Sequence, residues 1–318
     1  MQCEQGALYS YREAQTNLEK LTVHRRRVNN HNQIRQITDN VGAVLAEENF
    51  KPPTQKECPP PAHELIVQVD GGHIATKEKT KRSFEALSAV IYRPESIRTI
   101  DQHHGEIASK SCALSAQDDD LATIKTSVLN AARRQGLAQD TEVTALADGA
   151  TNCWSVILSL ERHCKQITGI LDWFHIGKKF QHVRSAVEDA DKETLERVKW
   201  TLWHGRPDEA LAKLYMLMTN VADAKKRSKL EDLYDYLERN KAYLAHYEER
   251  DKEQKTYTSQ VAESHIESII NARHNTSGKM QRTRAGAHKV LQIRGVIASN
   301  AWEDRWQGAV LSALEVAA

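Results

Sequence analysis

Residues Glu64–Ile74 read ELIVQVDGGHI, and this stretch decides the fold. Its first half is a β-branched apolar run, and three consecutive prolines at 59–61 prevent a helix immediately before it. Such a run is typical of a buried strand that begins a domain. We expect the strand to end at Asp70, because the two glycines that follow let the backbone turn sharply. A carboxylate at the open end of a strand suggests a metal or phosphate site, and an ordinary Asp-Gly turn is the competing interpretation.

The residues after this stretch alternate between strand and helix patterns. We expect strands over 82–92, 97–113, 142–147 and 166–171, and helices over 118–135 and 152–163. The first of these helices is expected to begin at its acidic residues 118–120, which favour a helix N-terminus. The first three strands can pair as a meander because their connections are short, whereas the later strands are joined through helices and should run parallel.

Aspartates follow two of the later strands as well, at Asp148 and Asp172. If the first and fourth strands are neighbours, Asp70 and Asp148 converge at one place on the sheet. Two carboxylates that converge need a cation or a shared proton to offset their repulsion. The pattern therefore favours a functional site over an ordinary turn.

The remaining patterns divide the chain into segments. A capping box of Ser10 with Glu13 predicts a helix over 10–21, and a second helix is expected over 30–48. With the basic turn 24–27 between them, these helices suit either a helix-turn-helix that docks on DNA or a hairpin that packs on the next domain. The predicted segments are a helical N-terminal part, 1–50; a linker, 51–62; an α/β domain, 63–175 and 258–300; a large all-helical insertion, 176–257; and a C-terminal tail, 301–318.

Composition excludes several classes of protein. The net charge is +1, so any surface for nucleic acid must be local. The five cysteines lack paired spacing, and His73, His103 and His104 have no second ligand pair nearby, which argues against a zinc site or a disulfide framework. No apolar run approaches the roughly 20 residues of a membrane span. We therefore expect a soluble cytoplasmic protein without a membrane partner.

One strongly basic stretch lies near the C-terminus. A helix is expected to begin near Ser259, with Glu263 and Glu267 on one face because they are four residues apart. No acid occurs between 273 and 294, a stretch expected to be partly loop, and its basic residues are Arg273, Lys279, Arg282, Arg284, Lys289 and Arg294. A polyanion lying across this stretch would bring a phosphodiester to whatever Glu263 helps to hold.

Taken in order, these motifs resemble the catalytic set of bacterial insertion-sequence transposases of the DDE class. The set is matched by Asp70 in QVDGGH, Asp148 in LADGATNCW and Glu263 in VAESHIES, with a helical insertion before the glutamate. The segment from Asp172 to His175 matches the D-x-x-H signature of the Mutator-like branch of that class. The run INARHNTSGKMQRTRAGAHKVLQIR is similar to the tail of those transposases, so the resemblance covers essentially the whole chain.

The resemblance implies an α/β fold with a ribonuclease H-like mixed sheet. In that fold Asp70, Asp148 and Glu263 bind two Mg²⁺ ions, for which Mn²⁺ can substitute. Paired ions of this kind activate a water or a 3′-hydroxyl for strand cleavage and strand transfer. By analogy, Asp172 and His175 orient the scissile phosphate or the DNA. The implied partners are double-stranded DNA, from the terminal repeats of the mobile element and from the target, and further copies of the chain, at the nucleoid.

Several alternatives stay open at this point. Glu267 is also followed by serine, so it competes with Glu263 as the third ligand. Asp172 and His175 could be a hydrogen-bonded pair at a strand end with no further role. Such transposases usually carry more sequence for recognising terminal repeats than residues 1–50 provide, so a non-catalytic DNA-binding remnant is the alternative function. A ribonuclease H-like nuclease that cleaves without strand transfer is a third interpretation.

Overall fold

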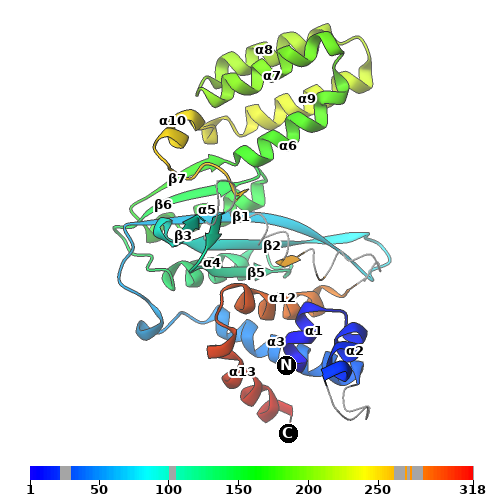
Figure 1. Ribbon diagram of the computed structural model, residues 1–318, viewed down its shortest axis with the longest axis vertical. Coiled ribbons are helices and arrows are strands. Elements are labelled where there is room, and N and C mark those ends of the chain that lie inside the picture. The colour runs from blue at the N-terminus through cyan, green and yellow to red at the C-terminus, as the bar shows by residue number, and fades with distance from the viewer. Residues whose placement is uncertain (22–29, 100–104, 261–268, 271–272, 274–281, 318) are drawn as a thin grey trace.

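The computed structural model describes residues 1–21, 30–99, 105–260, 269–270, 273 and 282–317. A five-stranded mixed sheet lies in the middle of the molecule, with the inserted helices at one end and helices from both chain termini at the other (Figure 1). The strands are β1 (Glu64–Ala75), β2 (Ser83–Tyr92), β5 (Ser111–Ser115), β6 (Glu142–Ala147) and β7 (Gln166–Leu171).

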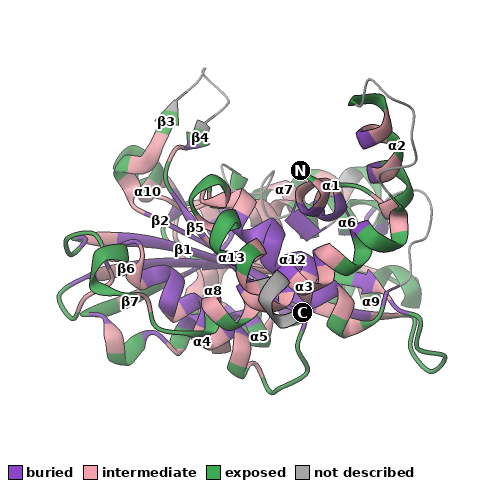
Figure 2. Ribbon diagram, turned by 90° about the horizontal axis from the view of Figure 1, so that it is seen from below, coloured by how far each residue is buried: buried purple, intermediate pink, exposed green. Residues whose placement is uncertain are grey.

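The strands lie in the order β5-β2-β1-β6-β7, and β2 alone runs antiparallel to its neighbours. This confirms the predicted meander and the predicted parallel direction of the later strands, and it makes the first and fourth predicted strands, β1 and β6, neighbours. The centre of β1 is buried from Leu65 to Val69, as a strand covered on both faces requires (Figure 2). Helix α4 (Ala122–Arg133) contacts β2 and β5, and helix α5 (Thr151–Leu158) contacts β1.

The predicted end of the first strand is wrong. Strand β1 continues through the two glycines to Ala75, because β2 continues to pair with it: Gly71 lies opposite Leu87, and Gly72 lies opposite Ala86. Asp70 therefore lies within β1, at the point where its other neighbour, β6, ends. Gly72 also leaves space for the Ile270 side chain, since a Cβ at this position would lie 2.9 Å from Ile270 Cγ2.

Two expectations for residues 97–135 are also corrected. The predicted third strand is divided into a short hairpin, β3 (Ile97–Thr99) and β4 (Gly105–Ile107), followed by β5. Helix α4 begins at Ala122, later than predicted, because Asp120 and Leu121 adopt left-handed backbone angles just before it. Asp119 still acts at the helix N-terminus, where its carboxylate accepts the Thr123 N–H at 3.0 Å.

The insertion is helical, as predicted, and it packs onto the sheet. It contains α6 (Trp173–Val183), α7 (Asp189–Trp203), α8 (Pro207–Asn220), α9 (Ala224–Arg239) and α10 (Tyr247–Lys252). Its leucine stripes join the same core as the strands. Tyr247 OH donates to the Leu171 carbonyl oxygen at 2.8 Å, and Trp154 Nε1 donates to Asn240 Oδ1 at 3.0 Å. The end of β7 is therefore held by residues of the insertion.

Helices from the two ends of the chain share a second core below the sheet (Figure 1). They are α1 (Gln2–Leu8), α3 (His31–Phe50), α12 (Arg284–Ala298) and α13 (Trp302–Ala317). Helix α2 (Tyr11–Leu21) packs on α3 in a separate small cluster. The capping box is confirmed: Ser10 N–H donates to the Glu13 carboxylate at 3.0 Å, and Glu13 N–H donates to Ser10 Oγ at 3.2 Å. Helix α3 packs on α12, as the hairpin interpretation expects, and docking on DNA stays a prediction.

In the C-terminal basic stretch, the described part from Arg284 is helical, in α12, and residues 274–281 lie outside the described residues. Gly295 lets α12 approach β5, since a Cβ there would lie 2.6 Å from Leu114 Cδ1. The expected tail is helix α13, which contacts α3, and Arg305 pairs there with Glu48 at 2.9 Å. The basic turn 24–27 and the histidines His103 and His104 lie outside the described residues. Among the helices that the structure describes, none has the length and apolar composition that a membrane crossing needs.

Candidate active site

Three aspartates lie at equivalent positions on three neighbouring strands, each directly after a residue that pairs with its counterpart on the next strand. In β1, β6 and β7 the partners are Val69, Ala147 and Leu171. The next residues along these strands are Asp70, Asp148 and Asp172. Because equivalent residues of parallel strands in register face the same side of the sheet, this row brings the three carboxylates to one place. The predicted convergence of the first two aspartates is therefore present, although one of them lies inside a strand.

Asp70 and Asp148 are both half-buried, and each carboxylate is fixed by a backbone group. Asp70 Oδ1 accepts the Gly71 N–H at 2.8 Å, and Asp148 Oδ1 accepts the Ala150 N–H at 2.9 Å. Tyr236 of helix α9 donates its hydroxyl to the Asp148 carbonyl oxygen at 2.9 Å. The insertion thus fixes the backbone at the end of β6, and both carboxylates are held in position before any ligand arrives.

Asp172 differs from the other two because it is buried, with 1% of its side chain exposed. It caps helix α6 by accepting the Phe174 N–H at 3.2 Å, and it accepts the N–H and the hydroxyl of Ser259 at 2.8 and 2.6 Å. His175 Nδ1 lies 2.6 Å from the same carboxylate. Burial alone would raise the pKa of Asp172, but the hydrogen bonds from His175 and Ser259 outweigh it and hold the pKa below its usual value.

A small cavity connects these groups. Its lining includes Asp70, Asp148, Asp172, His175 and Ser259, with residues of β1 and β6 forming the remaining wall. Four of the five predicted catalytic residues therefore border one space. The cavity has a volume of only about 10 Å³, and two fixed carboxylates and an imidazole oriented by Asp172 border it.

Cys153 of helix α5 is buried beside the aspartates, and their negative charge affects the pKa of its thiol. Burial raises the pKa of the thiol, and the negative charges of Asp148, Asp70 and Glu85 raise it further. A thiol in this state is not a nucleophile. Sequence analysis did not single out Glu85, whose carboxylate accepts the Asn152 side-chain amide at 2.8 Å. Its signal in the sequence is a single charge inside the mostly apolar run of β2.

The arrangement fits part of a Mg²⁺ site. Asp70 and Asp148 supply the hard oxygen ligands that Mg²⁺ prefers, and both border the cavity. Glu263 and Glu267, the two candidates for the third ligand, lie outside the described residues. Within the part of the chain that the structure does describe, no three His, Cys, Asp or Glu side chains gather closely enough to hold a metal ion. Asp70 and Asp148 are thus the two described members of the expected ligand set, and they border one cavity.

Three of the predicted DNA-binding residues are buried. Arg273, Arg282 and Arg294 expose 1%, 8% and 7% of their surface. Arg273 donates to the Gly6 carbonyl oxygen at 3.3 Å, and Arg294 donates to the Ala7 carbonyl oxygen at 3.0 Å. Burial lowers the pKa of Arg273 to about 9, helped by the charge of Arg282, and burial lowers the pKa of Arg294 to about 10. The expectation that these three lie across an open surface is corrected: Arg273 and Arg294 hold α1 to the C-terminal segment, and Arg282 donates to Tyr11 OH of α2 at 3.5 Å.

The other three predicted DNA-binding residues have different positions. Lys279 lies outside the described residues, and Lys289 is partly exposed on α12. Arg284 donates to the Ala116 carbonyl oxygen at 3.1 Å and pairs with Asp118 at 3.6 Å. An anion could therefore meet Lys289 and Arg284 from solvent, whereas Arg273 and Arg294 are engaged with backbone carbonyls.

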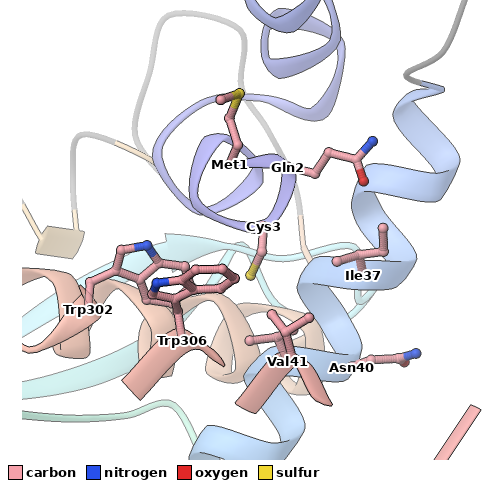
Figure 3. A pocket seen from close by; sticks show the side chains of 9 residues that line it. Met1, Gln2, Cys3, Ile37, Asn40, Val41, Trp302 and Trp306 are labelled. Carbon is pink, nitrogen blue, oxygen red and sulfur yellow. The ribbon is translucent and has the colours of Figure 1, made fainter. Parts of the chain in front are cut away.

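A second cavity of about 280 Å³ lies between α1, α3 and α13. Figure 3 shows the Cys3 side chain pointing toward the rings of Trp302 and Trp306, with Ile37 and Val41 on the opposite wall. None of its described lining side chains is charged, although Met1 carries the N-terminal ammonium group. Burial raises the pKa of the Cys3 thiol to about 12, so the thiol stays protonated. This cavity offers space for an apolar group but no reactive chemistry.

Comparison of the chain with models of known protein families finds no match, and neither does comparison with curated protein sequences. The geometry of the aspartate row and the order of the motifs are therefore the observations that bear on the function of this chain.

Proposed function

We propose that the chain is a DDE-type DNA transposase, which cuts a DNA strand with divalent ions and joins the resulting 3′ end to target DNA. The observation that carries the proposal is the placement of Asp70 and Asp148 on neighbouring parallel strands, directly after register partners and at one cavity. The proposal also requires a ribonuclease H-like fold, and the mixed sheet with its helical insertion is compatible with that requirement.

Each residue has a defined part in this proposal. Asp70 and Asp148 would hold Mg²⁺ or Mn²⁺, with Glu263 as the proposed third ligand. When bound, such ions activate the attacking water or 3′-hydroxyl and stabilise the leaving oxygen. Asp172 fixes the orientation of the His175 imidazole through Nδ1, and the imidazole borders the aspartate cavity. His175 and Asp172 are positioning residues for the DNA.

The first test is strand cleavage by the full chain. The substrate is a supercoiled plasmid that carries the DNA flanking the coding sequence, incubated with Mg²⁺. Asp148→Asn keeps an oxygen for the Ala150 N–H but loses the charge that holds a cation, so we expect nicking to fall at least about 100-fold. Asp140→Asn is the matched control, because Asp140 is exposed at the other end of the same strand. Equal nicking by wild type and Asp148→Asn overturns the assignment.

The second test measures the metal without activity. Mg²⁺ at about 100 times its Kd should stabilise the wild-type fold by about 2.7 kcal/mol, and Asp148→Asn should lose most of this gain. A chain that binds DNA but shows neither stabilisation nor nicking is the non-catalytic remnant. Supplying a pre-cleaved 3′-hydroxyl end then separates a transposase, which joins it to a second DNA, from a nuclease, which does not.

A further inference from the structure

An aromatic groove of about 500 Å³ lies next to the candidate active site. It opens between helix α6, helix α7 and residues 257–260. Its aromatic side chains are Trp173, Phe174, Trp200, Trp203 and Tyr257. Two lysines complete the charged part of its lining, and no acidic side chain occurs among the described residues that line it. Among its described lining residues, the groove therefore combines aromatic surface with positive charge.

The aromatic wall of this groove is only partly covered. Trp200 is 49% exposed. Its ring meets that of Trp203 edge-on, with centroids 6.0 Å apart, and Trp203 meets Tyr257 edge-on at 5.4 Å. A tryptophan that served packing alone would be expected to bury its ring. The half-exposed ring of Trp200 instead presents a surface on which a planar group can stack.

The two lysines lie beside these rings. Lys178 Nζ is 4.0 Å from the centroid of the Phe174 ring, and Lys199 Nζ is 5.8 Å from the ring centroids of both Trp173 and Trp200. These contacts hold ammonium groups at the rims of the aromatic surfaces. A ligand that carries both a planar ring and a negative charge would satisfy both features at once.

The groove and the aspartate cavity lie on either side of the first turn of helix α6. The neighbouring residues Phe174 and His175 line the groove and the cavity respectively. On the other chain segment, Ser259 binds Asp172, whereas Thr258 and Gln260 on either side of it line the groove. A strand that leaves the cavity across this turn would enter the groove.

We propose that this groove binds a single-stranded segment of the DNA that the aspartate cavity processes. Its bases stack on Trp200 and the neighbouring rings, and its phosphates lie beside Lys178 and Lys199. The inference rests on the proposed function for the identity of the nucleic acid. Stacking on a side chain requires an exposed base face, which paired and stacked bases in a duplex do not offer, so the segment is unpaired.

The first test uses a fluorescein-labelled dT12 oligonucleotide, the full chain and EDTA, with fluorescence anisotropy as the readout. Trp200→Ala should weaken binding roughly tenfold, as loss of a stacking platform does. Tyr215→Ala is the matched control, because Tyr215 is 50% exposed on α8 and does not line the groove. Lys199→Gln should lower the slope of log K against log salt by about 0.7.

The second test fills the groove without removing any contact. A Cβ added at Gly177 of α6 meets no atom within 4 Å, and the same is true at Gly308 of α13. Both glycines lie in helices, so Gly177→Phe and Gly308→Phe should fold alike. Only Gly177→Phe places a ring in the groove, and it alone should weaken dT12 binding, by at least about fivefold.

The outcomes separate this inference from the proposed function. If Asp148→Asn abolishes nicking while Trp200→Ala and Gly177→Phe bind dT12 like wild type, the groove is not a DNA site and the enzyme proposal stands. If dT12 binding depends on the groove but no nicking occurs, the inference stands and the enzyme proposal fails. Tighter binding of a duplex of the same length, or of rU12, than of dT12 overturns the assignment to single-stranded DNA.

Discussion

His175 Nδ1 lies 2.6 Å from Oδ2 of Asp172, a carboxylate that also accepts two hydrogen bonds from Ser259. Asp172 therefore links the end of β7, the first turn of α6 and the segment that leads toward the predicted third metal ligand. The same contacts orient an imidazole at the aspartate cavity. A structural role and the proposed positioning role coincide in this one side chain, and its substitution should show both.

Asp172→Ala should lower the free energy of unfolding by about 3 kcal/mol. The change leaves the N–H and the hydroxyl of Ser259 buried without their acceptor. Because the pKa of Asp172 is lowered in the fold, its contribution is complete above the unfolded pKa of about 4 and is lost as the pH falls through the folded pKa. Urea denaturation at pH 7 and pH 3 should therefore show a smaller difference between wild type and variant at pH 3. Equal differences at both pH values would contradict this account, and Asp140→Ala is the control.

A second prediction concerns the pH dependence of stability near neutrality. Burial lowers the pKa of His288 to about 4, and its neutral Nδ1 accepts the Ala116 N–H at 3.3 Å. The unfolded chain binds a proton at this histidine near pH 6.5 and the folded chain does not, so stability falls as the pH drops from 6.5 toward 4. Between pH 7 and pH 5 the wild type should lose about 2 kcal/mol from this group.

His288→Gln should remove this loss, because the glutamine amide oxygen can accept the Ala116 N–H and does not titrate. The measurement is urea denaturation at pH 7 and pH 5. The control is His182→Gln, an exposed histidine on α6. If His288→Gln lost as much stability as wild type between the two pH values, another group would carry the dependence.

Local patterns were enough for the elements that carry two of the aspartates. Strands β6 and β7 occupy the predicted residues because each is a short apolar run bounded by an Asp. The glycines after Asp70 were misread because their preference for turns is a local property, whereas the partner that extends β1 comes from residues 83–92. Pairing with a distant segment decided the conformation, and no pattern within ELIVQVDGGHI shows it.

Charge was a poor guide to the surface in the C-terminal region. A run with six basic residues predicts exposure because an unpaired charge is costly to bury. Arg273 and Arg294 are buried because backbone carbonyls of residues 6 and 7 accept their hydrogen bonds, and those partners lie more than 260 residues away in the sequence. Helix α1, which sequence analysis did not predict, supplies the missing partners.

The buried arginines lead to a prediction that separates structure from DNA contact. Arg294 donates to the Ile269 carbonyl oxygen at 2.5 Å and to the Ala7 carbonyl oxygen at 3.0 Å. Arg294→Met should lower the free energy of unfolding by about 3 kcal/mol, because both carbonyls lose a charged donor. At temperatures where the variant is folded, its salt dependence of DNA binding should equal that of wild type.

Lys289→Gln should have the opposite effect to Arg294→Met: it should change DNA binding and leave stability nearly unchanged. Lys289 is partly exposed on α12, so its loss should leave stability within about 0.5 kcal/mol of wild type and lower the salt slope of duplex binding by about 0.9 if it meets a phosphate. A changed slope for Arg294→Met, with the fold intact, would mean that the arginine reaches the DNA after all.

The contact between helices α3 and α12 gives a prediction with a clear sign. A Cβ at Gly42 of α3 would lie 2.4 Å from the Lys289 carbonyl oxygen, a backbone atom that cannot turn away. Gly42→Ala gains about 1 kcal/mol of helix propensity but must push the two helices apart, so we expect a net loss of about 2 kcal/mol. Gly308→Ala on α13 makes the same chemical change where nothing lies within 4 Å, and it should raise stability by up to about 1 kcal/mol. Thermal and urea denaturation of the two variants should therefore shift in opposite directions. A stabilised Gly42→Ala protein would show that the N-terminal helices do not pack on α12 at this distance in solution.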